Sequence, residues 1–301
     1  MVPIRQQNPF SFYDFLGYLI PGAVLLLGVV WLSYFYVEGD LVNSSSEFLG
    51  FLQRRNSSFY FLFVVFSYVS GHIVGYLSSI TVELFHNRYH GYPSFYLKDS
   101  DSVKSFLDYI SSEESEKHAV SRLLSPSWSK AKWLVLFILL FPISGLELVF
   151  GSMLGFNKYY TRCFSPLVSE MLEKKANDFF KGYKFGDEEG VLEWREHNYV
   201  RVLYHFSLEK ASSHPAKLQN YVALYGFLRN LSFCFLIFSW WVFVIFLVNI
   251  NFGYAIFAFV LFFTSFVLFL SFVKFYRRFS LESVMAFLSV ENQFSKGEAE
   301  N

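Results

Sequence analysis

Cysteine is nearly absent from this sequence, which has only two, Cys163 and Cys234. Two cysteines are too few for the disulfide framework of a small secreted protein or for a zinc site built from several thiolates. Cys234 also lies in a stretch that we predict to span a membrane, so we expect no bond between the two. The sequence therefore excludes the protein classes that depend on cysteine for their fold.

Charged residues are scarce as well. They make up 17% of the 301 residues, whereas a soluble domain usually carries about 25%. The formal net charge is zero, so the chain as a whole has no electrostatic attraction to nucleic acid or anionic lipid. In their place stand apolar residues, at 53%, including 40 phenylalanines. This balance is typical of a membrane protein.

The usual catalytic motifs are also missing. There is no Gly-rich phosphate loop, no Gly-x-Ser-x-Gly elbow and no Asp-Asp pair, and we expect neither a catalytic residue nor a cofactor. His86 and His90 have the spacing of metal ligands on a helix, and Glu83 lies one turn earlier. A zincin would place Glu directly after the first His, where this chain has Asn87. We therefore expect a polar helix end at the membrane surface and no metal site.

The longest uncharged stretch, residues 230–273, lies between Arg229 and Lys274. As a single helix, at about 1.5 Å per residue, it would be roughly twice as long as the hydrocarbon core is thick, and one span needs only about 20 residues. The stretch must therefore fold back, and two Asn and a Gly at 249–253 suit a tight turn. We predict a transmembrane hairpin with helices at 230–248 and 253–273.

Two more uncharged runs precede the hairpin. Residues 15–37 are long enough for a first span, and Pro21 either kinks this helix or marks its start. Residues 57–82, uncharged apart from His72, form a second span. The Ser-rich segment 38–55 between them is expected to be a short external loop.

Basic residues at both ends of the hairpin predict its orientation. Arg229 precedes it, while Lys274, Arg277 and Arg278 follow it, and such residues favour the cytoplasmic side. We expect a multi-pass membrane protein with both termini in the cytoplasm. The predicted fold class is an all-α membrane protein. Its expected parts are an N-terminal helix pair at 1–82, a helical cytoplasmic domain at 83–229, the hairpin at 230–273 and a tail at 274–301.

Residues 133–157 are apolar enough to span, but Pro142 interrupts their centre and Glu147 follows it. A charge at mid-bilayer costs a few kcal/mol. We favour a re-entrant or core-buried helical hairpin, and a kinked fifth span is the alternative.

Polar groups near or within the predicted spans are candidates for pore lining or gating, because each costs energy and requires a partner. Arg229 and Asp14 are expected to pair at the cytoplasmic boundary, either as structural helix ends or as a gate. His72 and Glu147 are the one pair that would suit a membrane-embedded hydrolase. The full set of candidate pore or gating residues is Asp14, Pro21, Gly71, His72, Gly75, Glu147, Arg229 and Asn230.

Small residues repeat at four-residue spacing in the second span, at Ser67, Gly71 and Gly75. Such a stripe allows another helix to approach closely. Packing within one chain is the simpler interpretation, and an oligomer contact or a pore-lining face is the functional one.

Basic and aromatic residues are interleaved in the predicted cytoplasmic helices. Aromatic rings can stack bases and basic side chains can contact phosphates, although a solvated surface balanced by acids is the simpler interpretation. The candidate ligand-binding residues are Lys174, Lys175, Trp194, Arg195, Arg201 and Lys217.

Three stretches resemble a family of bacterial membrane proteins: NPFSFYDFLGYLIPG at 8–22, SYVSGHIVGYLSS at 67–79 with GYPS at 91–94, and LYGFLRNLS at 224–232. The family is similar to the membrane effector of Hailong-type anti-phage defence, which is encoded beside nucleotidyltransferase-like partners. The resemblance covers the two N-terminal spans and the start of the hairpin. Its motifs are structural, and none of them assigns a ligand residue.

The resemblance implies an oligomeric ion channel in a bacterial inner membrane, held closed by a nucleotide or short DNA ligand and opened on infection, as in abortive infection. Its partners would be other copies of the chain, with a tetramer as the working assumption, and a nucleotidyltransferase-like protein or its oligonucleotide product. A membrane-embedded hydrolase and a non-enzymatic scaffold that recruits a cytosolic partner are the alternatives.

Overall fold

A computed structural model describes residues 12–93, 134–156, 162–181, 199–210 and 214–290. Throughout these residues the regular structure is helical, without strands. Within the described ranges, four helices are long and apolar enough to cross a membrane: Phe15–Glu38, Ser57–Tyr89, Pro215–Asn249 and Phe252–Ser289. The predicted all-α membrane fold with four spans is confirmed.

The first span is one continuous helix with a wider turn near its start. It consists of α1 (Phe12–Asp14), the π-helical η1 (Phe15–Leu19) and α2 (Ile20–Glu38). Pro21 lies in the first turn of α2, so it marks a change of helix type rather than a break. Gly39, at φ +66°, ends the helix in the left-handed conformation that glycine adopts without strain.

The segment expected to be a loop at 38–55 contains a helix, α3 (Leu41–Gln53). The carboxylate of Asp40 caps its N-terminus by accepting hydrogen bonds from the backbone N–H groups of Val42 at 3.2 Å and Asn43 at 3.1 Å. Trp31 Nε1 donates to Ser45 Oγ at 3.3 Å, which ties α3 to α2. The serines therefore lie within a helix, and the loop prediction is wrong here.

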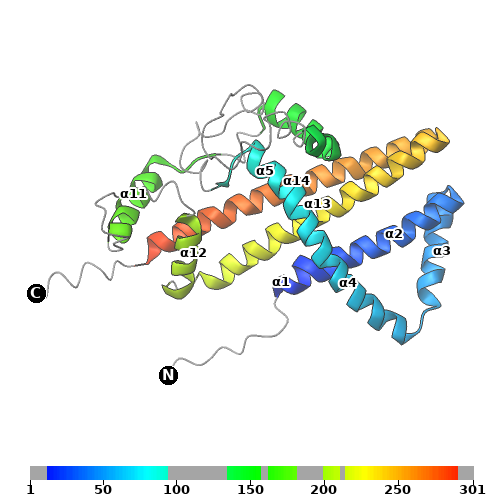
Figure 1. Cartoon of the computed structure of the whole chain (residues 1–301), viewed down its shortest axis with the longest axis horizontal. Helices are drawn as coiled ribbons and strands as arrows, with labels where there is room; N and C mark the ends of the chain where they lie inside the picture. The colour runs from blue at the N-terminus through cyan, green and yellow to red at the C-terminus, as the bar shows by residue number, and fades with distance from the viewer. Residues whose placement is uncertain (1–11, 94–133, 157–161, 182–198, 211–213, 291–301) are drawn as a thin grey trace, which may run out of the picture.

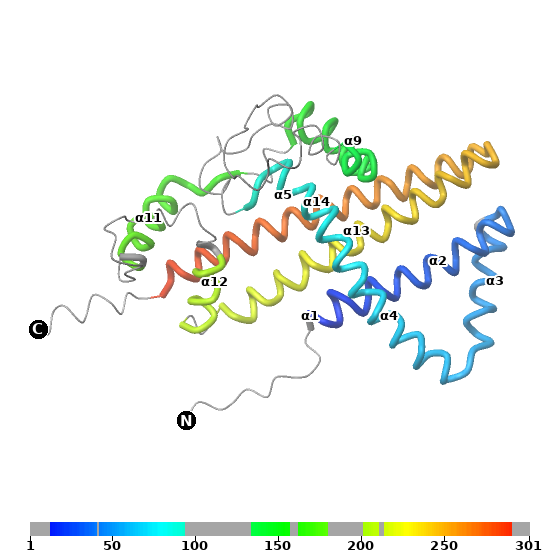
Figure 2. The backbone as a smooth tube through the Cα atoms, in the orientation of Figure 1, coloured from blue at the N-terminus to red at the C-terminus, as the bar shows by residue number. Residues whose placement is uncertain are grey.

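The second span is longer than the predicted 57–82. It consists of α4 (Ser57–Ser78), the π-helical η2 (Ser79–Glu83) and α5 (Leu84–Tyr89). Figure 2 shows it as one bent tube that crosses α2 and continues toward the last helix of the chain.

The third and fourth spans are α13 (Pro215–Asn249) and α14 (Phe252–Ser289), which lie side by side along the molecule (Figure 1). The predicted turn is confirmed: Ile250 has φ +49°, and Asn251 Oδ1 accepts the N–H of Gly253 at 2.9 Å. In the middle of the pair, Ser232 Oγ donates to Ser265 O at 2.9 Å, and Ser265 Oγ donates back to Ser232 O at 2.8 Å. These reciprocal bonds fix the register of the two helices.

Residues 134–156 do not form one long helix. Residues 134–139 are helical, a turn follows at Leu140, and the chain continues as α9 (Phe141–Leu146) and the π-helical η5 (Glu147–Met153). Leu140 and Ile143 are fully buried, and Trp240 Nε1 on α13 donates to Leu139 O at 2.9 Å. The segment is thus a broken, core-packed pair of short helices, as expected from Pro142.

A second, smaller core joins two further helices to the end of α14. These are α11 (Pro166–Lys181) and α12 (Tyr199–Lys210). The core consists of Phe164, Leu172, Ala176, Phe179, Leu203, Val284 and Phe287. The predicted cytoplasmic part therefore packs directly on a helix that continues into the membrane, and the boundaries drawn at 229 and 274 fall inside α13 and α14.

Candidate functional site

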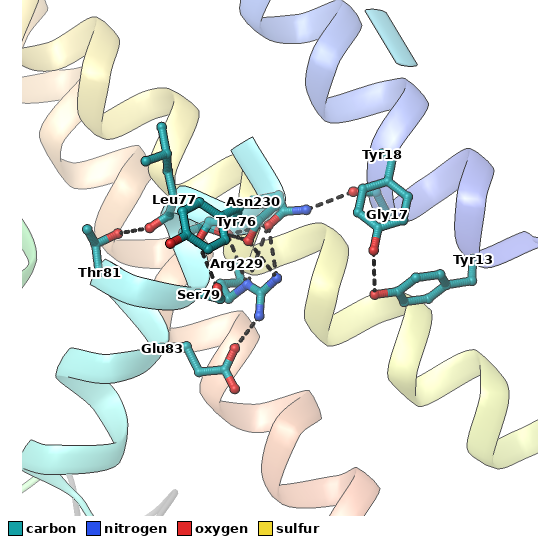
Figure 3. A network of polar contacts seen from close by, with 12 residues as sticks. Tyr13, Gly17, Tyr18, Tyr76, Leu77, Ser79, Thr81, Glu83, Arg229 and Asn230 are labelled. Carbon is teal, nitrogen blue, oxygen red and sulfur yellow. Dashed lines mark hydrogen bonds and ion pairs between the residues drawn. The ribbon is translucent and has the colours of Figure 1, made fainter. Parts of the chain in front are cut away.

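A partly buried polar network joins the first three spans near their predicted cytoplasmic ends (Figure 3). Backbone carbonyls of the first and second spans and side chains of the second and third contribute to it. Its members are Gly17, Gly75, Ser78, Glu83, Arg229 and Asn230.

Pro21 leaves one backbone carbonyl of the first span without its usual helical hydrogen bond. Proline has no backbone N–H, so it cannot donate to the carbonyl of Gly17, four residues earlier. Asn230 Nδ2 donates to that carbonyl at 2.7 Å, and the Asn230 side chain is 1% exposed. An amide buried this deeply requires partners, and the π-helical turn before Pro21 provides one.

Arg229 makes the contacts with the second span. Its Nε donates to Ser78 Oγ at 3.0 Å and its Nη2 to Gly75 O at 3.2 Å. Its Nη1 forms an ion pair with Glu83, whose side chain is 23% exposed against 12% for the arginine. Ser78 Oγ in turn donates to Asn230 Oδ1. The guanidinium thus holds the bent region α4–η2 against α13.

The pairing expected between Arg229 and Asp14 is wrong, because the carboxylate on Arg229 belongs to Glu83. The second helix continues past residue 82, and this extension brings Glu83 to the arginine. Gly17, Ser78 and Glu83 are the network residues that sequence reasoning missed. The sequence contained a signal for this ion pair. Glu83 directly follows the uncharged run of the second span, and Arg229 directly precedes the uncharged run of the hairpin.

The small-residue stripe of the second span is filled by the first span of the same chain. A Cβ at Gly71 would lie 1.9 Å from the carbonyl oxygen of Tyr18, and one at Gly22 would lie 1.8 Å from the carbonyl oxygen of Ser67. Gly75 is buried beside Tyr18 and Asn230. The simpler interpretation, packing within one chain, accounts for Gly71 and Gly75.

His72 and Glu147 have different surroundings. The His72 ring stacks on Tyr18, with ring centroids 3.9 Å apart, and is exposed on the outer side of α4. Glu147 is fully buried and contacts His90 Nε2 at 3.2 Å. The structure therefore does not support a catalytic pair of His72 and Glu147.

The predicted ligand-binding residues do not converge on one described site. Lys175 Nζ donates to the carbonyls of Leu288 and Val290 at the C-terminus of α14, where a cation is favoured, and its partial burial there lowers its pKa. Lys217 pairs with Glu282 at 2.8 Å. Lys174 and Arg201 are exposed, while Trp194 and Arg195 lie outside the described residues.

A metal site is absent from the part of the chain that the structure describes, where no three His, Cys, Asp or Glu side chains are placed to share an ion. His86 and His90 are buried within the chain, with 0% and 1% exposure. Their expected position at the membrane surface stays a prediction.

Searches among protein families, curated proteins and solved structures find no match to this chain.

Proposed function

We propose that this chain is the subunit of an oligomeric ion channel in a bacterial inner membrane, an effector of anti-phage defence whose gate responds to a nucleotide or oligonucleotide. The four apolar spans support the membrane part of this proposal. The resemblance of the segments 8–22, 67–79 and 224–232 to a defence effector supports the rest.

The continuity of α13 and α14 is the observation that carries the proposal. With 35 and 38 residues, these helices are about 52 and 57 Å long, against a hydrocarbon core of about 30 Å. The surplus lies on the side where α11 and α12 pack. A displacement of those helices would be transmitted along stiff rods into the membrane, as a ligand-controlled gate requires.

The polar network lies where such a displacement would act. Rotation of α13 would move Arg229 and Asn230 together, away from the second and first spans. We therefore assign the network the role of a lock for the closed state. Because the spans of one chain pack against each other through buried side chains, the conducting path would lie between copies.

Overproduction of the ligand-free protein in bacterial cells is expected to depolarise the membrane, as measured with a potential-sensitive dye. At equal amounts in the membrane fraction, Glu83→Gln is expected to depolarise more strongly, because it weakens the lock. Lys217→Met, which breaks the exposed ion pair with Glu282, serves as the control and should match the unaltered protein. An unchanged membrane potential with the protein confirmed in the membrane would contradict the proposal.

A further inference from the structure

His72 is a hydrogen-bonding side chain on the exposed surface of a membrane span. The structure places it on the outer side of α4, and it is the only histidine, lysine, arginine or acid in the four predicted spans. At about 1.5 Å per residue it lies about 16 Å along the helix from Glu83. That distance is about half the thickness of a hydrocarbon core of about 30 Å, so His72 is expected near the middle of the membrane.

Two tyrosines of the same chain hold the His72 ring in place. The ring stacks on Tyr18 of the first span, with centroids 3.9 Å apart, and lies edge-to-face with Tyr68, with centroids 4.7 Å apart. Neither of its ring nitrogens has a hydrogen-bond partner among the described residues. Tyr76 lies one turn further along α4, and its side chain is 66% exposed. Its hydroxyl group also forms no hydrogen bond with a described residue.

The interior of a bilayer offers no partner to these groups. Lipid tails neither donate nor accept hydrogen bonds, and an unsatisfied polar group among them costs several kcal/mol. Reaching the headgroups from within the membrane is a property of the long side chains of lysine and arginine, and the histidine side chain is too short for it. His72 therefore requires water or another protein molecule on this side of α4.

The hairpin has an outer surface of a different kind. Its exposed side chains include Val244, Leu247, Phe259, Val260 and Phe263. The hydroxyl group of Thr264 donates to Val260 O at 2.8 Å, so it is satisfied within its own helix. This part of the surface suits lipid tails, and it provides no hydrogen-bond partner for His72 of a neighbouring copy.

We propose that the side of α4 that carries His72 and Tyr76 lines the water-filled conducting path between copies of the chain. The inference rests on the proposed channel function and assigns the side of the subunit that faces the path. Water in the path supplies the hydrogen bonds that lipid tails lack, and polar and aromatic side chains that line a pore control which ions pass.

The lining is also connected with the polar network. Tyr18, on which His72 stacks, directly follows Gly17, whose carbonyl accepts the amide of Asn230 at 2.7 Å. A movement of α13 that withdraws Asn230 would therefore free the helix turn that carries Tyr18. The first span thus joins the network to a side chain of the conducting path.

The test is the reaction of single cysteines with a charged, membrane-impermeant methanethiosulfonate, in liposomes that contain the ligand-free protein. Cys163→Ser combined with Cys234→Ala removes the native thiols, and ion flux through this background protein tests the channel itself. His72→Cys, Tyr76→Cys and Phe263→Cys are then introduced one at a time. Tyr76 has no ring contact with a described residue, so Tyr76→Cys reports on the same side of α4 without disturbing the stack on Tyr18.

Phe263→Cys is the control matched in depth. Phe263 is 45% exposed and lies about 16 Å along α14 from Lys274, as His72 does along its own helix from Glu83. We expect His72→Cys and Tyr76→Cys to react on the order of tenfold faster than Phe263→Cys or more, because the reactive thiolate forms in water and not among lipid tails. Reaction at position 72 should also cause loss of ion flux, since the attached charged group then lies in the path.

Three results would overturn the proposal. Reaction at positions 72 and 76 as slow as at position 263, with flux through the background protein, would show that lipid or protein covers this side of α4, and the channel would stand. Fast reaction at both positions without any change in flux would place this side in water outside the path. No flux through the inserted and folded background protein would contradict the channel and, with it, the path.

Discussion

Alanine at Gly71 is expected to separate the first and second spans. The added Cβ would lie 1.9 Å from the oxygen and 2.5 Å from the carbon of the Tyr18 carbonyl. Both are backbone atoms, so no side-chain rotation can relieve the overlap and one helix must shift. Overpacking typically costs about 1–3 kcal/mol and occasionally more, and we expect a loss of about 3 kcal/mol. The free energy of unfolding in detergent micelles measures it.

Gly50→Ala is the matched control for this substitution. Gly50 lies inside α3, and a Cβ there would meet nothing within 4 Å. Because glycine destabilises a helix interior by about 0.5–1 kcal/mol relative to alanine, Gly50→Ala should stabilise the protein slightly. If Gly71→Ala is as stable as Gly50→Ala, the two spans do not cross at Gly71.

Methionine at Arg229 is expected to have the largest effect on stability. It removes the donors to Ser78 and Gly75 and leaves the carboxylate of Glu83 without its counter-ion in a largely buried place. Breaking a buried ion pair by removal of one partner typically costs about 3–5 kcal/mol. A double-mutant cycle with Glu83→Gln separates the two contributions: the double variant should recover part of the loss, because it contains no unpaired charge.

Lys217→Met provides the control for the double-mutant cycle. It also breaks an ion pair, with Glu282, but the lysine side chain is 51% exposed. Exposed ion pairs contribute little to stability, so the unfolding midpoint should hardly change. A loss in Arg229→Met as small as that in Lys217→Met would show that the network does not hold the spans together.

The spans could be predicted from the sequence because the bilayer imposes a simple rule. A run such as 230–273 has no charged residue and is too long for one crossing, so a hairpin and its turn follow from length alone. Pro142 predicted the break in 134–156 in the same direct way. Such features depend on neighbours along the chain, which a sequence displays.

The partners within the site could not be predicted, because they depend on how helices cross. Arg229 had two acidic candidates at the same boundary, Asp14 and Glu83, and only the bend and extension of the second span decide between them. The role of a basic residue is also hard to predict from the sequence. A lysine that binds a phosphate and one that caps a helix, as Lys175 does, look alike in sequence. Asp40 was a sequence signal for α3, since it is a preferred N-cap residue, but the serines that follow favoured a loop.

The measurement that tests the central claim most directly is ion flux through the purified protein in liposomes, with and without short single-stranded oligodeoxynucleotides. We predict flux in the absence of oligonucleotide and its suppression when oligonucleotide is added. Because the same preparation is compared in both conditions, the difference reports the gate and not the amount of inserted protein. No flux in either condition, with the protein shown to be inserted and folded, would contradict the account.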